Sequence, residues 1–398
     1  MTNRFLTSWV LTAAIVVSVA GVSNFLVDPY GLFRFIDVVG TNQQKEGVRN
    51  KIRFVKALEL PLRRPETLLM GSSRVHDAMN PEHPLLQEFP PVYNLGVDMN
   101  RIHETHVLLR HATENTNVKR VVLGLDFFMF NSAQRANFDF DETLIGRKVG
   151  FADYLGPSIL SKDAVLDSIR TIRASAQQSG RREFLSNGYR PQAFYGIKNY
   201  VNVHYYTNWI FLTSKPQNTI YYSGMALHDE VFDEFEAILV FCYRKKIDLR
   251  LYINPAHAHL DGEGIRALGQ LEMFENWKRR LTEIAWRHNV PLWDFSGYNS
   301  VTTEPVTSPM KYYWDSSHFT ETVEDWILKR IFGADDLIPA DFGLRLTPKN
   351  IEAHLDAIRR DRERYVIANR TVLLALEGDY KAIINGAPLD PSRLKEMY

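Results

Sequence analysis

Short apolar runs alternate with helical patterns along most of this chain. The runs of strand type are ETLLMGS, VYNLGV, VKRVVLGLDFFMF, IDLRLYIN and VPLWDF. Apolar residues at spacings of three and four fill the intervening segments Ile102 to Glu114, Glu230 to Lys246, Arg266 to Asn289 and Glu321 to Phe332. This alternation predicts an α/β fold with a mostly parallel sheet that is covered by helices on both faces.

The N-terminus carries an apolar stretch without charge. Phe5 to Val27 contains no Asp, Glu, Lys or Arg, and at about 1.5 Å per residue it would span a hydrocarbon core roughly 30 Å thick. Residues 1–27 are therefore expected to be a transmembrane anchor; a cleaved signal peptide is the alternative, because small residues precede Gly21. Arg4 before the span favours a single-pass protein of the inner (cytoplasmic) membrane, with its main domain in the periplasm or outside the cell.

The rest of the chain divides into three predicted parts. Residues 28–66 predict an irregular lead-in segment, 67–333 the α/β domain and 334–398 a C-terminal helical tail. The alternation is interrupted over 131–228, which predicts a large insertion, either a cap over the sheet or a small subdomain. Its aromatic cluster, Phe194 to Phe211, would form either a platform for sugar rings or the core of the insertion.

The composition limits the partners and cofactors. The 47 basic residues balance 47 acidic ones, and the absence of a long basic run argues against nucleic acid as a partner. A single cysteine, Cys242, excludes an internal disulfide and is expected to be buried. Because no Cys/His spacing resembles a structural zinc site, neither a metal nor another cofactor is expected.

Two serines follow the first predicted strand. In TLLMGSSR, Gly71 permits a sharp turn, and Ser72 and Ser73 fall at the carboxyl end of the strand, where open parallel sheets bind ligands. A serine nucleophile needs a base, and the base needs an orienting acid. DSSH near the other end supplies both, since Asp315 and His318 are three residues apart. Taken alone, either motif is more often a plain turn or helix start.

Together, these motifs resemble the SGNH/GDSL hydrolase superfamily. GSSR at 71–74, YNLGV at 93–97 and DSSH at 315–318 occur in the order of its sequence blocks. The resemblance implies a three-layer, flavodoxin-like sandwich with Ser73 as nucleophile, His318 as base and Asp315 as orienting acid. It also implies an oxyanion hole formed by Ser73 and Gly96. With its anchor and insertion, the chain is most similar to the membrane-anchored branch that includes alginate-type O-acetylation and teichoic acid D-alanylation proteins.

One position departs from the superfamily pattern. Asp126, in LGLDFF, stands where an asparagine amide usually completes the oxyanion hole. An ionised carboxylate cannot donate a hydrogen bond and would repel a developing oxyanion. Either Asp126 has another role and a different donor replaces the amide, or the chain is a non-catalytic descendant.

Several polar and aromatic residues are candidates for substrate contact. They are Arg74, Asn94, Arg101, Asp126, Asn254, His257 and Trp314. For Arg74 and Arg101, a structural ion pair is the alternative. His257 and His259 can face one way in an extended segment, but no third ligand is evident. The sequence therefore favours the rim of the site, or simple loop polarity, over a metal at these histidines.

The expected function is that of a membrane-anchored serine esterase or O-acyltransferase. Its substrate would carry acyl groups on a cell-envelope or exported polysaccharide, and a membrane acyltransferase is an expected partner. The triad alone does not separate hydrolysis from transfer, because the two differ in water exclusion and in the acceptor site. The alternative is a non-catalytic glycan-binding or scaffold component of a polysaccharide modification or export complex.

Overall fold

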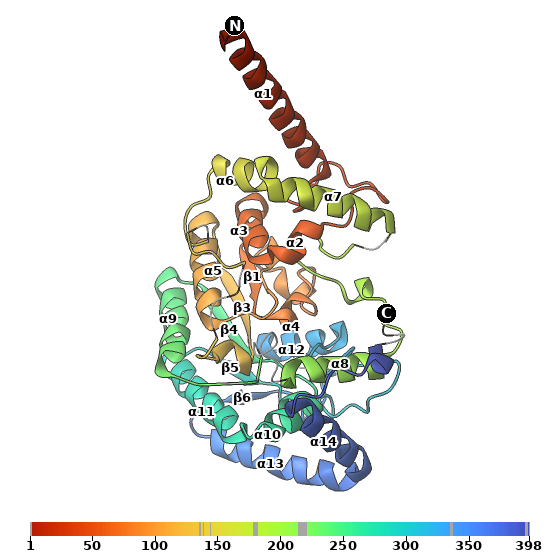
Figure 1. Ribbon diagram of the computed structural model, residues 1–398. Helices are drawn as coiled ribbons and strands as arrows, with labels where there is room; N and C mark the ends of the chain where they lie inside the picture. Colours follow the sequence, from red (N-terminus) through yellow and green to blue (C-terminus); the bar gives the residue numbers. More distant parts are fainter. Residues whose placement is uncertain are drawn as a thin grey trace.

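A single six-stranded sheet organises the chain (Figure 1). The computed structural model describes residues 2–134, 137, 139–143, 145–177, 182–213, 221–334, 337–394 and 397. The strands lie in the order β2-β1-β3-β4-β5-β6. Their bounds are β1 (Thr67–Met70), β2 (Val92–Asn94), β3 (Arg120–Leu125), β4 (Asp248–Ile253), β5 (Leu292–Asp294) and β6 (Leu344–Leu346). Strands β1 to β5 are parallel and β6 is antiparallel to β5, so the predicted mostly parallel α/β sheet is confirmed.

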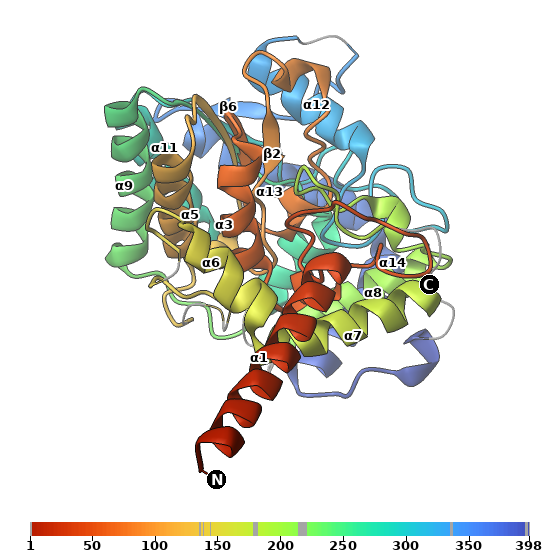
Figure 2. The ribbon, with the colours of Figure 1, turned by 90° about the horizontal axis from the view of Figure 1, so that it is seen from above.

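Alternate residues of the strands enter two separate apolar clusters. Leu68 and Met70 of β1 belong to one cluster, whereas Leu69 belongs to the other. The first cluster includes residues of α3 (Ile52–Arg63), α5 (Ile102–Asn115), α9 (Asp229–Lys245) and α11 (Leu271–Arg287). The second includes residues of α4 (Ser73–His76) and α12 (Glu321–Phe332), and Figure 2 shows α12 across the sheet from α3, α5 and α9. Burial on both faces explains why the strands are continuously apolar.

The direction of the strand order changes at β1. Strand β2 lies on one side of β1 and β3 on the other, which is the arrangement that opens a crevice at the carboxyl ends of neighbouring strands. Gly71 follows β1 with a φ of +150°, and a Cβ there would lie 2.5 Å from Val75 Cγ2 and 2.8 Å from the Gly124 carbonyl oxygen. Only glycine fits this turn, so the segment after β1 is brought close against β3.

Most of the predicted helices agree with the structure. Helices α5, α9 and α12 match their predicted ranges to within one residue at each end, and Cys242 is buried on α9. The helix predicted from Arg266 to Asn289 is divided into α10 (Ile265–Ala267) and α11. Gly269, with a φ of +71°, separates the two. A left-handed residue cannot continue an α-helix, which accounts for the break.

Helix α1 (Thr2–Val27) projects from the body of the molecule (Figure 1). Its segment Arg4–Val27 is long and apolar enough to cross a membrane. The base of the helix is fixed to the domain by polar contacts of Asn24, whose Nδ2 donates to the Ile159 carbonyl at 2.7 Å and whose Oδ1 accepts from the Ser168 hydroxyl at 2.9 Å. Asn24 is therefore buried, although it lies in an otherwise apolar and exposed helix.

Part of the predicted lead-in belongs to the folded core. Residues 28–66 contain α2 (Glu46–Asn50) and α3, and α3 packs against α5. Lys56 of α3 donates to the carbonyls of Asn94 at 2.8 Å, Gly96 at 2.6 Å and Gly188 at 2.9 Å. The prediction of an irregular segment is thus corrected. Lysines are rarely buried, so the sequence pattern does not place residues such as Lys56 on the buried face of a helix. The helix α3 was therefore not predicted.

The predicted insertion has two parts with different neighbours. The first contains α6 (Phe151–Leu155), the π-helix η3 (Gly156–Leu160) and α7 (Lys162–Gln177), and it packs against α1 and α2. The second contains η4 (Gln192–Phe194) and α8 (Tyr200–Leu212). Arg190 and Tyr195 of this second part bond to Asp77, directly after α4. Among the described residues, this second part thus contacts the segment that follows β1, at the carboxyl edge of the sheet.

The C-terminal tail contributes to the sheet as well as to its surroundings. It contains β6, α13 (Ile351–Ala368) and α14 (Arg370–Ile384), and the two helices lie at the end of the molecule opposite α1 (Figure 1). The strand was not predicted, because its three residues are flanked by turns and two of them are exposed. The remaining short helices are η1 (Pro84–Leu86), η2 (Phe127–Phe130), the π-helix η6 (Ala258–Gly264) and η7 (Pro391–Leu394).

Candidate active site

The two serines after β1 have different environments. Ser72 caps α4: its Oγ accepts from the Arg74 N–H at 3.2 Å and donates to Asp126 Oδ2 at 2.5 Å. Ser72 is fully buried, whereas Ser73 is 9% exposed. Ser73 is the first residue of α4, and its hydroxyl faces His318. The structure thus gives Ser72 a capping role and leaves Ser73 as the accessible serine.

Ser73, His318 and Asp315 form a continuous hydrogen-bonded chain. Ser73 Oγ lies 2.9 Å from His318 Nε2, and His318 Nδ1 lies 2.7 Å from Asp315 Oδ2. The other carboxylate oxygen of Asp315 accepts the backbone N–H groups of Ser317 at 2.6 Å and His318 at 2.7 Å. A carboxylate can only accept, so Nδ1 carries the proton and the Nε2 lone pair faces Ser73. The structure brings together the three residues predicted as a triad.

The carboxylates near His318 stabilise its protonated imidazole. Burial alone would raise the pKa of Asp315, but the His318 charge and the hydrogen bonds to the carboxylate lower it from the ordinary value. Burial alone would lower the pKa of His318. The charge and hydrogen bond of Asp315, and to a smaller extent the charge of Asp77, raise this pKa above its ordinary value of 6.5. An imidazolium is the state that His318 reaches when it accepts the serine proton, and this environment favours that state.

A second carboxylate lies beside the imidazole. Asp77 Oδ2 is 3.9 Å from His318 Nε2. Arg190 holds Asp77 with two bonds, from Nε at 2.6 Å and from Nη2 at 2.9 Å, and the Tyr195 hydroxyl donates to the same carboxylate at 3.1 Å. Arg190 thus forms an ion pair with Asp77, and the charge of Asp77 is still among the causes that raise the pKa of His318. The contacts of Arg190 and Tyr195 also join the second part of the insertion to the triad.

Aromatic rings cover the imidazole. The Trp314 ring stacks on His318 with centroids 4.7 Å apart and an interplanar angle of 21°. The Tyr195 ring packs against the Trp314 ring, and the two centroids are 4.7 Å apart. The His318 side chain is only 13% exposed. Trp314, predicted as a substrate contact, thus packs on the ring of His318, and both side chains are largely buried.

Arg74 lies at the centre of a buried ion-pair network. Its Nη1 lies 2.7 Å from Asp126 Oδ1, both Nη atoms lie 3.1 Å from Asp261 oxygens, and its Nε donates to the Ser317 hydroxyl at 2.9 Å. Arg74 and Asp126 are each 1% exposed. Burial raises the pKa of Asp126, although Arg74 opposes this effect. Of the alternatives given for Arg74, the structure shows the structural ion pair rather than a substrate contact, and Asp126 has the other role of balancing this charge.

The YNLGV segment forms hydrogen bonds to the backbone of the segment after Ser73. Asn94 Nδ2 donates to the carbonyls of Val75 at 2.9 Å and Met79 at 2.8 Å, and Asn94 Oδ1 accepts the Gly96 N–H at 2.9 Å. Asn94 is fully buried. The predictions of substrate contact for Asn94 and of an oxyanion donor at Gly96 are therefore corrected. Gly96 is required for another reason, since a Cβ there would lie 2.7 Å from the His76 nitrogen.

Three more of the predicted contact residues are buried at the carboxyl edge. Arg101 donates to the Phe128 carbonyl at 2.7 Å, and His257 Nε2 lies 2.7 Å from the Glu304 carbonyl oxygen. Both are buried, so their predicted substrate contact is corrected as well. Asn254 follows β4 and is also buried, but among the described residues its side-chain amide has no hydrogen-bond partner. Asn254 thus keeps both a donor and an acceptor uncommitted.

Comparisons with known proteins do not name a family for this site. Family models, curated proteins and solved structures all give no significant match. Function is therefore argued from the residues of the site and from the motifs that carry them.

Sequence reasoning missed the residues around the triad that come from the insertion and from η6. Asp77 lies four residues after Ser73, and this helical spacing was a usable signal for its place beside the site. Arg190 and Tyr195 had no such signal, because they reach Asp77 across a separation of more than a hundred residues. Asp261, in HAHLDGEG, was not singled out because its partner, Arg74, is distant in the sequence.

Proposed function

We propose that this chain is a membrane-anchored serine esterase or O-acyltransferase. The observation that carries the proposal is the chain of hydrogen bonds from Ser73 through His318 to Asp315 at the carboxyl edge of the sheet. The strand order 2-1-3-4-5 of the parallel strands and the burial of both sheet faces support a three-layer, flavodoxin-like sandwich of SGNH type. The resemblance of the three motifs to that superfamily points in the same direction.

Acylation would begin at the Ser73 hydroxyl. Ser73 Oγ attacks the acyl carbonyl carbon of the donor while His318 Nε2 accepts the hydroxyl proton. Asp315 holds the Nδ1 proton and stabilises the imidazolium. The tetrahedral intermediate then collapses, the bond between the acyl carbon and the leaving oxygen breaks, and His318 returns the proton to that oxygen. The product is an ester between the acyl group and Ser73.

The oxyanion of the intermediate needs hydrogen-bond donors. Ser73 is the first residue of α4, so its N–H has no acceptor within the helix and is available. Gly96 and Asp126 do not supply the second donor, because the Gly96 N–H bonds to Asn94 Oδ1 and the Asp126 carboxylate is paired with Arg74. Asn254 is the best candidate, because its amide is buried at the same edge of the sheet and is unpaired among the described residues. An amide is also the group that the superfamily places in its oxyanion hole.

The second half of the reaction decides between hydrolysis and transfer. His318 removes a proton from water or from a sugar hydroxyl, whose oxygen attacks the acyl carbon. The bond between the acyl carbon and Ser73 Oγ then breaks, and His318 returns the proton to Ser73 Oγ. The Trp314 ring stacks on His318 and the Tyr195 ring packs on Trp314, and shielding of the base from water would favour transfer to a bound hydroxyl. The proposed acceptor or substrate is a cell-envelope or exported polysaccharide, since aromatic rings with polar tips suit sugar rings.

The proposed location follows from α1. Its apolar residues would anchor the chain in the inner membrane as a single-pass protein, with the domain in the periplasm or outside the cell. A membrane acyltransferase that supplies acyl groups from the cytoplasmic side fits this arrangement as a partner. The exposed side chains of α1, such as Phe5 at 74% and Trp9 at 65%, have the apolar surface that such an anchor requires.

A product assay tests the proposal. The full-length chain in detergent is incubated with an acylated phenol donor, with and without an oligosaccharide acceptor. Free acid identifies an esterase and acylated sugar a transferase, and both products should disappear in Ser73→Ala. If neither product exceeds the level of Ser73→Ala with any acyl group from acetyl to butyryl, catalysis is contradicted for this donor class.

The second candidate function is a non-catalytic glycan-binding or scaffold protein. It is favoured by one observation: two of the positions expected to donate to an oxyanion, Gly96 and Asp126, have no available donor. Losing a donor of this kind typically costs about 3 kcal/mol of transition-state stabilisation. This candidate predicts that glycan binding is equal in the wild type and in Ser73→Ala, and that neither forms an acyl-enzyme.

A further inference from the structure

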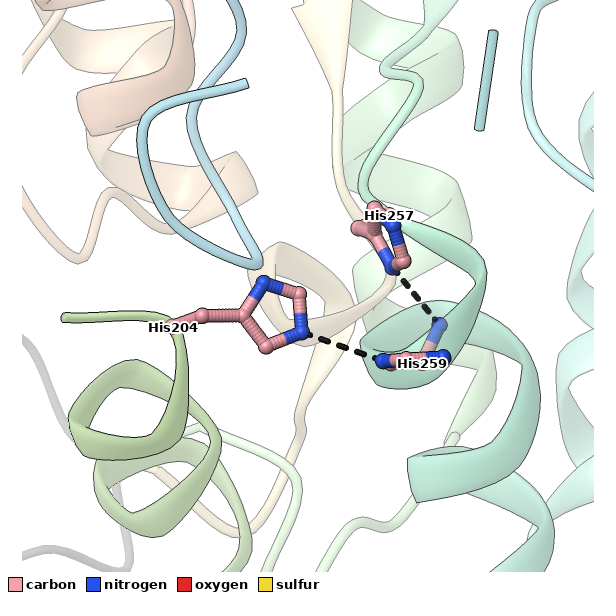
Figure 3. A group of neighbouring side chains, drawn as sticks. All are labelled: His204, His257 and His259. Carbon is pink, nitrogen blue, oxygen red and sulfur yellow. Dashed lines mark hydrogen bonds between the residues drawn. The ribbon is translucent and has the colours of Figure 1, made fainter. Parts of the chain in front are cut away.

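Three buried histidines from two distant segments meet beside the proposed active site. His204 lies on α8, whereas His257 and His259 lie at the start of η6 (Figure 3). The ring centroids are 4.8 Å apart for His204 and His257, 5.3 Å for His204 and His259, and 4.5 Å for His257 and His259. One ring nitrogen from each residue can be chosen so that all three lie within 4.8 Å of one another.

In two of these rings, the nitrogen that points away from the other histidines forms a hydrogen bond to a carbonyl or a hydroxyl group. His257 Nε2 lies 2.7 Å from the Glu304 carbonyl oxygen, so Nε2 carries the proton and Nδ1 has a lone pair. His259 Nε2 lies 3.0 Å from the Tyr365 hydroxyl. Histidines that bind metal are oriented in this way, with the nitrogen away from the ion bonded to a carbonyl, carboxylate or water.

The inner nitrogens lie at nearly the spacing that a metal ion imposes. His204 Nε2 and His259 Nδ1 are 3.2 Å apart. Two nitrogens at about 2.1 Å from a tetrahedral zinc ion would be roughly 3.4 Å apart. His257 Nδ1 accepts the His259 backbone N–H at 3.1 Å, and an ion would replace this bond as well as the hydrogen bond between His204 Nε2 and His259 Nδ1. Figure 3 shows both interactions as dashed lines, converging on His259.

One nitrogen of the third ring is not used by the described part of the protein. His204 Nδ1 is buried and has no hydrogen-bond partner among the described residues. Neutral imidazole is the form of histidine that binds a metal ion. A cluster built only for packing would gain nothing from this third polar ring.

We propose that His204, His257 and His259 bind a divalent transition-metal ion, and that zinc is the ion best suited to the site. Imidazole nitrogen is a good ligand for zinc, copper and nickel, and a site of three histidines is a known arrangement for zinc. The fourth position of the ion is left to a water molecule or another small ligand. The sequence had given no third ligand for His257 and His259; the fold supplies it from the insertion.

Such an ion would connect the insertion to the triad loop. The His257 N–H donates to the Ser316 carbonyl at 3.1 Å, and Ser316 lies between Asp315 and His318. His204 belongs to α8 in the second part of the insertion, whose Arg190 and Tyr195 hold Asp77. The ion would thus fix α8 against η6 and support the loop that carries the base. This role does not depend on whether the triad is catalytic.

Metal binding is tested on the full-length chain in detergent, purified with a tag that contains no histidine. The protein is stripped with a chelator, and zinc chloride is then titrated by calorimetry. We expect one equivalent to bind in the wild type, and His204→Ala to weaken binding by at least about 100-fold, since removal of an outer partner alone costs 10- to 100-fold. Tyr365→Phe, which removes only the partner of His259 Nε2, should weaken it by about 10-fold.

His106→Ala is the matched control. His106 lies 2.7 Å from a carboxylate oxygen of Glu234, which also contacts His103, so this surface group is the competing site for adventitious zinc. The control should bind one equivalent as tightly as the wild type. The proposal is overturned if the wild type binds no zinc, if His106→Ala loses the binding, or if His204→Ala and Tyr365→Phe both retain wild-type affinity. Should His204→Ala fail to fold, Tyr365→Phe and the wild-type stoichiometry still decide.

Discussion

Asp126 and Arg74 form a buried ion pair, with 2.7 Å between Asp126 Oδ1 and Arg74 Nη1. The second oxygen of Asp126 accepts the Ser72 hydroxyl, and Arg74 continues to Asp261 and to Ser317. The residue that departs from the superfamily pattern therefore joins β3 to the nucleophile turn, to η6 and to the triad loop. Its carboxylate is needed to balance a buried guanidinium, which an asparagine amide would not do.

Asp126→Ala should lower the free energy of unfolding by about 3–5 kcal/mol, because it leaves Arg74 buried with one fewer carboxylate. Asp126→Asn keeps the shape and should lose less. Thermal unfolding in detergent gives the order of the two variants. Asp325→Ala is the control, since the half-exposed Asp325 pairs with His83 and Lys329 at the surface, as far as the described residues show, and should cost at most about 1 kcal/mol. Equal losses for Asp126→Ala and Asp325→Ala would contradict the network.

Asp315→Asn should reduce acyl-enzyme formation by about 10⁴-fold, as the loss of the orienting carboxylate does in other triads. The substitution also removes the charge that raises the pKa of His318. His318 acts as a base only when it is neutral, so activity rises with pH through this pKa. In the wild type the midpoint of this rise, called the acid limb of the pH profile, should lie above pH 6.5. In Asp315→Asn the acid limb should lie at a lower pH. An acid limb that stays in place would exclude His318 as the base.

Asp77→Asn should also move the acid limb to lower pH, because the Asp77 charge is among the causes that raise the pKa of His318. Tyr195→Phe is the control, since it removes a hydrogen bond to Asp77 without changing a charge. The pH dependence of the labelling rate with a fluorophosphonate provides the measurement. The account fails on this point if Tyr195→Phe shifts the limb as far as Asp77→Asn does.

Asn254→Leu should lower the rate of acylation by about 10²–10³-fold, the typical cost of losing one oxyanion donor. Stability should be unchanged or higher, because leucine replaces a buried amide that has no partner among the described residues. Trp314→Phe serves as the comparison. It keeps an aromatic ring beside His318 and replaces the larger indole, with its N–H, by a phenyl ring, and it should stay within a few fold of the wild-type rate. Full activity in Asn254→Leu would rule out Asn254 as the donor.

The sequence was informative where chemistry is local. The strands were recognisable as continuous apolar runs, and the sharp turn at Gly71 followed from the residue type. Asp315 and His318 could be paired because three residues separate them. Their place beside Ser73 was implied by the resemblance of the motifs to the SGNH/GDSL superfamily, together with the need of a serine nucleophile for a base.

The sequence was uninformative where one side chain satisfies another across the fold. For Arg74 the sequence left substrate contact and a structural ion pair open, because the partners Asp126 and Asp261 are distant in the sequence. For Gly96 the superfamily resemblance implied an oxyanion donor, and the sequence did not show that Asn94 Oδ1 accepts its N–H. The histidine cluster was missed for the same reason: His204 comes from α8 and the other two from η6. Helix α3 was missed because its buried lysine and arginine look like surface residues.

The central claim is that Ser73, and not Ser72, is a nucleophile activated by His318. The most direct measurement is intact-mass and peptide analysis of the full-length chain after reaction with a fluorophosphonate. We predict one adduct, located on Ser73, which is absent in Ser73→Ala and still forms in Ser72→Ala, since Ser72 contacts Asp126 rather than the base. An adduct on Ser72, or no adduct on folded wild-type protein, would contradict the claim.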